Sequence, residues 1–269
     1  GKRTYQYFLV ANGIIGPVLL GAAVATFFNG SNFVVSKGNI TQEAMPVISQ
    51  WANGWHGLDA LLDLWNVVLG LAVLFLSRCL GILYFINNVS DAELLPRFRR
   101  RLMVEAVCFV AFFVPFVIYV LLKDGFAVDA ASGSIVMESY KYFHNLMAMP
   151  WVLGLFLLGV VAVLFGLGRS ILCATYNKGI WFAGVGTVLA VLALLLTVGY
   201  NNTAYYPSAA DLQSSLTLSN SCSSLFTLKT MAYVSVFIPF VLAYIIYAWR
   251  AIDRKPITAD EMKESDHAY

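Results

Sequence analysis

Six long runs of apolar residues, separated by polar stretches, dominate the sequence. They cover approximately residues 7–28, 61–86, 102–122, 146–167, 180–199 and 231–249. Each run is long enough to cross about 30 Å of hydrocarbon as a helix rising about 1.5 Å per residue. None alternates with the period of two that a membrane barrel requires, and continuous apolar runs in lipid satisfy their backbone polar groups only as helices. The pattern predicts an all-α, polytopic membrane bundle with six transmembrane helices.

The composition agrees with a bilayer as the solvent. Apolar residues make up 59% of the 269 positions and charged residues only 12%, whereas ordinary globular chains carry about 25% charged residues. Too few polar side chains remain to cover a water-facing surface. This argues against a soluble enzyme, a nucleic-acid binder and a disordered scaffold.

The positions of the basic residues predict the topology. If the first helix starts in the cytoplasm, thirteen of the 17 Lys and Arg residues fall on the cytoplasmic side. The densest run is Arg97, Arg99, Arg100 and Arg101, which we interpret first as a topology anchor and second as an anionic-lipid site. Both termini are then cytoplasmic. We expect a transmembrane domain over residues 1–251 and a solvated tail over residues 252–269.

Two long polar loops lie on the opposite side, at residues 29–60 and 200–230. Loops of this length in a compact bundle are usually functional or covered by a partner. Within the first loop, residues 42–51 are expected to form a short interfacial helix. Proline kinks are expected at Pro115 and Pro239.

Acidic residues near the second helix are the first candidates for chemistry. Asp59 and Asp63 are four residues apart, with His56 one turn earlier, so all three are expected along one helix face. One interpretation is a relay for protons or for a quinone headgroup. The other is capping of the helix N-terminus by the acids, with His56 at the interface.

Glu105 is the second candidate. It follows Arg101 by four residues, which predicts an ion pair on one helix face. The alternative is an entry carboxylate for protons from the cytoplasm. Arg78 is expected to extend to the headgroups or to pair with an acid of a neighbouring subunit.

Haem ligation by this chain is not expected. A haem needs an axial ligand such as His or Met at apolar depth, whereas His56 and His144 lie at helix ends and His267 lies in the tail. No Cys-x-x-Cys or nucleotide-binding motif is present, and the four cysteines are expected to be small core residues without disulfides. We therefore predict no cofactor or metal held by its own side chains.

Glycine-rich helix faces predict close packing, in part against a partner chain. These glycines are Gly13, Gly16, Gly21, Gly154, Gly159, Gly184 and Gly186.

Several blocks of sequence are long enough to be distinctive. The final stretch contains Ser223-Ser224-Leu225-Phe226-Thr227-Leu228, followed by Met231, Val234, Pro239, Tyr244, Trp249, Arg254, Ile257 and Thr258. Upstream lie Gly199-Tyr200-Asn201-Asn202-Thr203-Ala204-Tyr205-Tyr206-Pro207 and Asp211-Leu212-Gln213-Ser214-Ser215-Leu216-Thr217. Further blocks are residues 26–31, 45–51 and 179–184. Together these blocks resemble subunit II of cytochrome bd quinol oxidase, and the resemblance covers essentially the whole chain.

This resemblance implies a subunit of a quinol:oxygen oxidoreductase of the bacterial inner membrane. It implies a partner, subunit I, that ligates the b-type and d-type haems and oxidises quinol. Subunit II would support assembly, lipid or quinone packing and part of the proton route, with a small accessory subunit as a further partner. The enzyme class is oxidoreductase, with no activity expected from this chain alone.

The chain departs from that family in its number of helices. The resemblance implies nine helices starting outside, so we expect three further helices before Gly1, together with the family's early acidic residues. A secondary transporter or permease is the alternative function, suggested by Gly16-Pro17 and the two proline-containing helices. A third possibility is an assembly scaffold without chemistry of its own.

Overall fold

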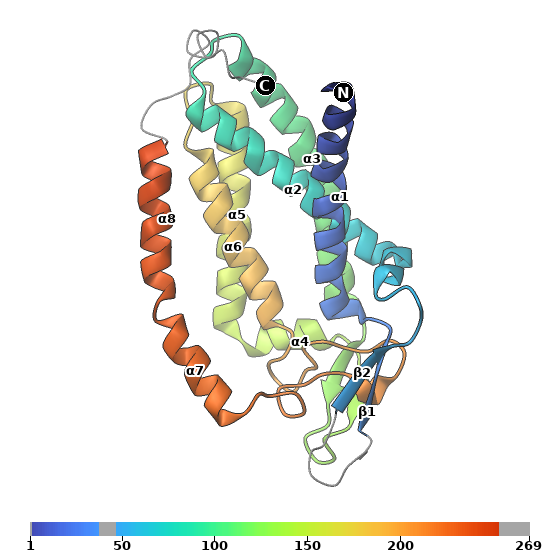
Figure 1. Ribbon diagram of the computed structural model, residues 1–269. Helices are drawn as coiled ribbons and strands as arrows, with labels where there is room; N and C mark the ends of the chain where they lie inside the picture. Colours follow the sequence, from blue (N-terminus) through green and yellow to red (C-terminus); the bar gives the residue numbers. More distant parts are fainter. Residues whose placement is uncertain (1, 38–46, 253–269) are drawn as a thin grey trace.

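The computed structural model describes residues 2–37 and 47–252. Over these residues, six helical segments are long and apolar enough to cross a membrane, as predicted. They are α1 (Lys2–Asn29), α2 (Leu64–Asn88), α3 (Leu94–Leu122), α5 (Pro150–Leu172), α6 (Gly179–Leu196) and the consecutive pair α7 (Leu225–Ser235) and α8 (Ile238–Ile252). The start of α1 and the end of α8 lie at the same end of the bundle (Figure 1).

Two spans begin later than predicted, whereas the first, third and last begin earlier, at Lys2, Leu94 and Leu225. The second span begins at Leu64 rather than 61, because Leu58–Leu62 form a separate 3-10 helix, η1, and Asp63 has an extended backbone. The fourth begins at Pro150 rather than 146. Lys141–Ala148 form the short helix α4, which ends at Met149, and Pro150 opens α5 because proline suits the first helical turn.

The two prolines act differently from each other. Pro115 lies inside α3, which continues past it. The last span is interrupted between Ser235 and Ile238, immediately before Pro239. Proline lacks the backbone N–H that would donate to the carbonyl of Ser235, four residues earlier, and its ring crowds that carbonyl, which explains an interruption at this place.

Two β-hairpins lie beyond the helices, at one end of the bundle that we call the hairpin end (Figure 1). Strand β1 (Phe33–Lys37) pairs antiparallel with β2 (Val47–Trp51), and β3 (Gly125–Val128) pairs with β4 (Ile135–Glu138). The interfacial helix expected over 42–51 is therefore wrong for 47–51, and residues 42–46 lie outside the described residues. Backbone pairing with β1 replaces the intrahelical hydrogen bonds there.

The two long loops cover each other at the hairpin end. Ser31 donates its backbone N–H to the carbonyl of Pro207 over 3.1 Å, and Phe33 stacks on Tyr206 with ring centroids 5.4 Å apart. The β3–β4 hairpin joins them, since Ala204 donates to the carbonyl of Phe126 over 2.9 Å. Loop length here is explained in part by contacts within the chain.

Glycines allow the backbones of neighbouring helices to come into direct contact. A Cβ on Gly21 of α1 would lie 2.7 Å from the Cα of Gly70 on α2, and one on Gly159 of α5 would lie 2.5 Å from the backbone N of Ala190 on α6. Gly186 packs in the same α5–α6 contact. The other glycines predicted for tight packing face open space: Gly13, Gly16, Gly154 and Gly184.

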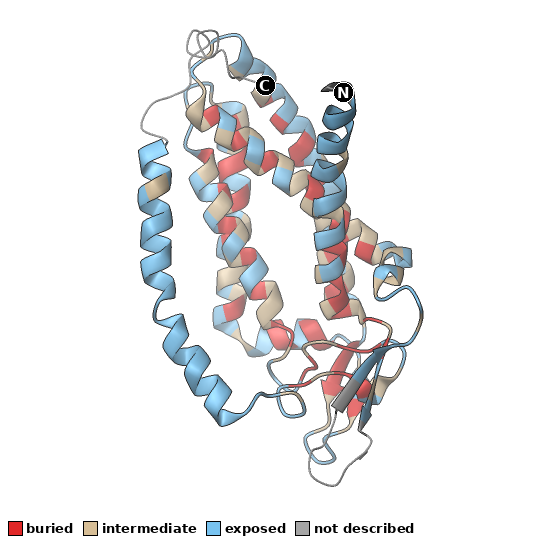
Figure 2. Cartoon of the chain, in the orientation of Figure 1, coloured by how far each residue is buried: buried red, intermediate tan, exposed pale blue. Residues whose placement is uncertain are grey.

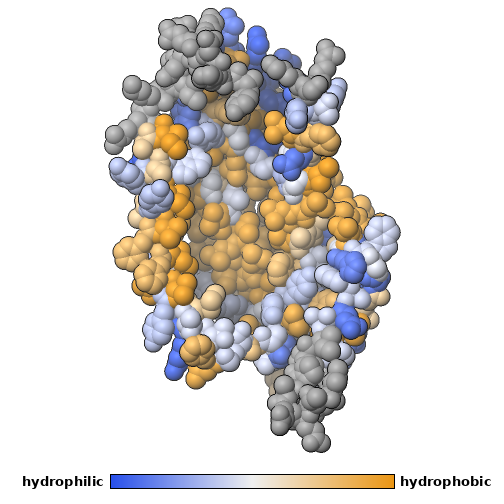
Figure 3. All heavy atoms as spheres, in the orientation of Figure 1, coloured by the Kyte–Doolittle hydropathy of each residue, from blue (hydrophilic) through white to orange (hydrophobic). Residues whose placement is uncertain are grey.

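The pair α7–α8 stands away from the other helices and has no buried residue (Figure 2). Between it and α1 lies a hollow with an apolar floor (Figure 3). A cavity of about 300 Å³ on the inner faces of α1, α2, α3 and α6 is lined almost entirely by apolar side chains, among them Leu20, Leu69 and Phe116. These surfaces suit lipid or further protein rather than water.

Candidate functional site

Asp63 caps the N-terminus of α2. Its Oδ1 accepts hydrogen bonds from the backbone N–H groups of Trp65 over 2.8 Å and Asn66 over 3.1 Å. A carboxylate at this position satisfies free donors and complements the helix dipole. Capping was one of the two interpretations of this residue, and the structure confirms that Asp63 does it.

Asp59 and His56 do not share a helix face with Asp63, so the predicted alignment is wrong. His56 and Gly57 have positive φ angles of 51° and 90°, and the extended Asp63 ends η1 before α2 begins. The Asp59 carboxylate accepts hydrogen bonds from the side-chain amides of Asn32 and Asn53, which lower its pKa. His56 instead lines a cavity of about 470 Å³ beside Trp51 and Leu58.

A polar junction that the sequence did not reveal joins α1, α2 and α3 at the hairpin end. Lys123 Nζ donates to the carbonyl of Phe28 and to Asn29 Oδ1, both over 2.8 Å. The Tyr119 hydroxyl donates to the same Asn29 oxygen over 3.1 Å, and Asn29 Nδ2 donates to Asn66 Oδ1 over 2.7 Å. Burial lowers the pKa of Lys123 to about 8.

The position of the junction gave only a weak signal in the sequence. Asn29 and Lys123 each follow an apolar run, and Asn66 stands near the start of one. Polar residues at the ends of membrane helices are common, and nothing in their spacing indicates that they meet. Only the close packing of the three helices brings them together.

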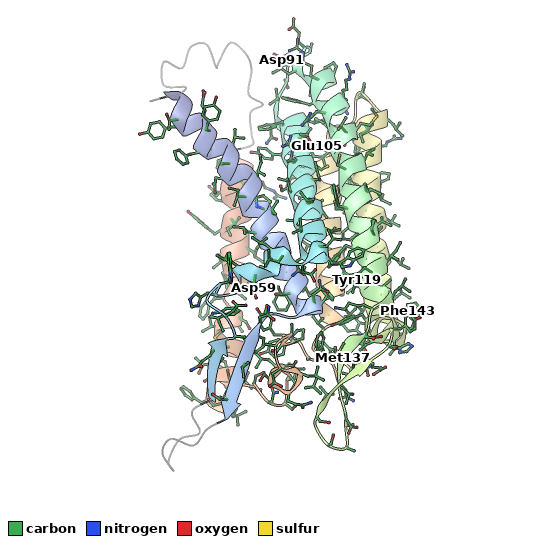
Figure 4. All side chains as sticks on the ribbon, turned by 90° about the vertical axis from the view of Figure 1, so that its right-hand side faces the viewer. Asp59, Asp91, Glu105, Tyr119, Met137 and Phe143 are labelled. Carbon is green, nitrogen blue, oxygen red and sulfur yellow. The ribbon has the colours of Figure 1, made fainter. Side chains whose placement is uncertain are left out.

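Glu105 lies at the opposite end of the bundle, which we call the arginine end because it carries Arg97–Arg101 (Figure 4). The predicted pair with Arg101 is confirmed, with Nε of Arg101 2.7 Å from Glu105 Oε1. Arg78 of α2 contacts the same oxygen through Nη2 over 2.8 Å. Arg78 therefore pairs with an acid of its own chain.

Arg99 is buried, so it does not act as an exposed topology anchor. Its guanidinium donates to the backbone carbonyl of Ser170, to those of Cys173 and Ala174 over 3.0 and 2.8 Å, and to Asn177 Oδ1 over 3.0 Å. These acceptors form the C-terminus of α5 and the turn into α6. The arginine satisfies carbonyls that an α-helix end leaves free.

The four candidate residues thus do not form one site. His56, Asp59 and Asp63 lie at the hairpin end and Glu105 at the arginine end, as the labels of Asp59 and Glu105 in Figure 4 show. Over the described residues, no three His, Cys, Asp or Glu side chains gather in a way that would hold a metal ion.

Comparison of the sequence with known proteins identifies its family. The family described as cytochrome bd terminal oxidase subunit II matches residues 1–252. The chain belongs to this family. It is also similar to the proteins named cytochrome bd-I ubiquinol oxidase subunit 2 of Escherichia coli (strain K12) and of Escherichia coli O157:H7. Each is 24% identical over 290 aligned residues, which cover 99% of this chain and 69% of the relative.

Membership of this family agrees with the six membrane spans and indicates where the chain acts. It is a multi-pass protein of the bacterial inner membrane and a subunit of a cytochrome bd-type quinol oxidase, an oxidoreductase that depends on haem. Subunit I is the partner that subunit II implies. The transporter alternative is not favoured.

Proposed function

We propose that this chain is the companion subunit of the oxidase, which supports assembly and oxidation of quinol while subunit I ligates the b-type and d-type haems. On its own the chain would have no quinol oxidase activity. The complex of this family contains haem. The observation that carries the proposal is where the His, Met and Cys side chains of this chain lie. Haem needs His, Met or Cys at apolar depth on a packed helix.

The donor set of the described spans does not fit a haem. His56 and His144 lie outside all six spans, at the hairpin end. Met103 and Met231 lie on exposed helix surfaces. Cys79 of α2 is buried and Cys108 of α3 is half-buried, but over the described residues neither thiol belongs to a group of three His, Cys, Asp or Glu side chains. We therefore derive no step through haem in this chain.

The exposed apolar surfaces support an assembly role. The pair α7–α8 exposes its large apolar side chains, including Phe226, Phe237 and Phe240. We propose that subunit I, membrane lipid and the isoprenoid chain of quinone cover such surfaces, with a small accessory subunit as a further partner. Purification of the complex followed by mass spectrometry would identify each of these components.

Among the four candidate residues, we propose proton entry for Glu105 and favour structural roles for the two aspartates. Glu105 is 1% exposed and uses one carboxylate oxygen for both arginines. Asp63 is occupied by its capping hydrogen bonds and Asp59 by two amides. His56 remains a candidate for headgroup contact because it lines the cavity at the hairpin end.

Expression of the chain with and without subunit I tests the main proposal. We expect b-type and d-type absorbance bands and quinol-dependent oxygen consumption only when both subunits are present. The chain purified alone should contain no haem by pyridine haemochrome assay. A stoichiometric haem signal from the isolated chain would overturn the assignment of the ligands to subunit I.

A further inference from the structure

The ion-paired cluster at the arginine end carries more positive charge than its carboxylate can neutralise. Arg78 and Arg101 come from different helices, and both contact the same atom, Glu105 Oε1, over 2.8 and 2.7 Å. Two guanidinium groups and one carboxylate leave a net charge of plus one. Because Glu105 is only 1% exposed, the excess positive charge faces outward through the arginines, whose side chains are 40% and 59% exposed.

The cluster also leaves polar atoms without partners. Within the described residues, Glu105 Oε2 and Arg78 Nε are buried and accept or donate no hydrogen bond. Buried polar groups without partners are rare and costly, and here one is an acceptor and the other a donor. The hydrogen bonding of Arg78 is therefore incomplete, and an anionic oxygen drawn to this guanidinium would supply an acceptor.

The depth of the cluster matches that of lipid phosphates. After Arg101, α3 continues through Leu102–Leu122, an apolar stretch as long as one span. Arg101 therefore stands at the boundary of the hydrocarbon. Val104 and Val107, on the next turn into the membrane, are 48% and 65% exposed and offer an apolar surface to acyl chains. Arg97, one turn before Arg101 and also exposed, adds positive charge on the headgroup side.

We propose that Arg78 and Arg101, positioned by Glu105, form a binding site for an anionic phospholipid such as a phosphatidylglycerol. The two guanidinium groups bind the phosphate, because arginine donates in a planar fork that matches its oxygens. Glu105 fixes both side chains in a shared position through its Oε1. The site is independent of haem, so its test does not depend on the assignment of haem ligands.

The test uses the delipidated complex with subunit I. Dioleoyl phosphatidylglycerol or dioleoyl phosphatidylcholine is added in detergent, and bound lipid is counted by native mass spectrometry. The wild-type complex should retain phosphatidylglycerol in preference to phosphatidylcholine. The triple variant Arg78→Gln, Arg101→Gln, Glu105→Gln leaves no unpaired buried charge and should lose that preference by about fivefold, the effect of one net charge at a membrane surface. Arg100→Gln, an exposed arginine of the same run, should retain it.

Glu105→Gln alone keeps the proposal testable if the triple variant does not assemble. It keeps both guanidinium groups and removes the competing negative charge, so it should bind phosphatidylglycerol at least as well as the wild type. Unchanged preference in the triple variant, or weaker binding in Glu105→Gln, would overturn the proposal. Displacement of the lipid by equimolar inorganic phosphate would also overturn it, because the site would then recognise the free anion.

Discussion

Arg78 on α2 and Glu105 on α3 are joined across the arginine end by an ion pair of 2.8 Å, in which the carboxylate is buried and the arginine half-exposed. The pair connects two spans at a point where Arg101 already serves the same oxygen. Removing one partner of a buried ion pair destabilises a protein, because the other charge stays buried and unpaired. Replacing both partners together costs much less stability. The contact therefore stabilises the α2–α3 packing only as long as both residues are present.

A double-mutant cycle should reveal this dependence. Arg78→Met is expected to lower the free energy of unfolding by about 1–2 kcal/mol, less than for a fully buried pair because Arg101 remains and Arg78 is partly solvated. Adding Glu105→Leu should recover part of the loss. Thermal unfolding of the purified complex measures both. Equal and additive losses in the two single variants would mean that the residues are not coupled.

The buried Arg99 should be more sensitive to conservative replacement than its neighbour. Lysine offers one ammonium group where the guanidinium serves five acceptors of the α5–α6 turn, the carbonyl of Tyr176 among them. We expect Arg99→Lys to destabilise by about 1–3 kcal/mol. Arg100→Lys, on the exposed side of the same helix, should change stability by less than about 0.5 kcal/mol. Similar melting temperatures for the two variants would contradict the role of the carbonyl contacts.

The contact between Gly21 and Gly70 predicts another matched pair of variants. A methyl group on Gly21 would meet the Gly70 backbone at 2.7 Å, so Gly21→Ala must push α1 from α2 and should cost about 1–3 kcal/mol. Gly16 on the same helix faces open space. Gly16→Ala should be neutral or stabilise by up to about 1 kcal/mol, since alanine favours helix more than glycine does. Thermal unfolding in detergent compares them, and a neutral Gly21→Ala would show that α1 can shift freely.

Lys123 predicts a specific pH dependence. Burial holds its folded-state pKa at about 8, below the ordinary value of 10.5. Between these values the unfolded chain binds more protons than the folded chain, so stability rises with pH, by at most about 1.4 kcal/mol per pH unit. Lys123→Met removes this contribution. The difference in melting temperature between variant and wild type should therefore change from pH 8 to pH 10, and a constant difference would contradict the buried lysine.

Asp63 allows its two interpretations to be separated by chemistry. Asparagine caps helices about as well as aspartate but carries no charge, whereas alanine neither caps a helix nor carries a charge. If Asp63 only caps α2, Asp63→Asn should keep quinol oxidase turnover and stability, and Asp63→Ala should lose about 1 kcal/mol of stability. A large drop in turnover for Asp63→Asn with unchanged assembly would instead support a role in proton transfer or quinone binding. Oxygen consumption and thermal unfolding are measured together.

The sequence alone determined the features that depend on neighbours along the chain. The six apolar runs became six spans because lipid leaves an apolar segment no other way to satisfy its backbone. The Arg101–Glu105 pair followed from the helical spacing of four residues. The same local reasoning failed between His56 and Asp63, where two positive φ angles and a capping aspartate replace the expected helix.

Tertiary structure decided every feature that joins distant parts of the chain. Arg78 reaches Glu105, Lys123 reaches Asn29, and Arg99 closes the α5–α6 turn because the helices pack at particular rotations and depths. Apolar runs in lipid are nearly uniform around their axes, so hydropathy says little about which face meets which neighbour. Close contacts such as Gly21 on Gly70 fix that choice, and with it the position of each buried charge.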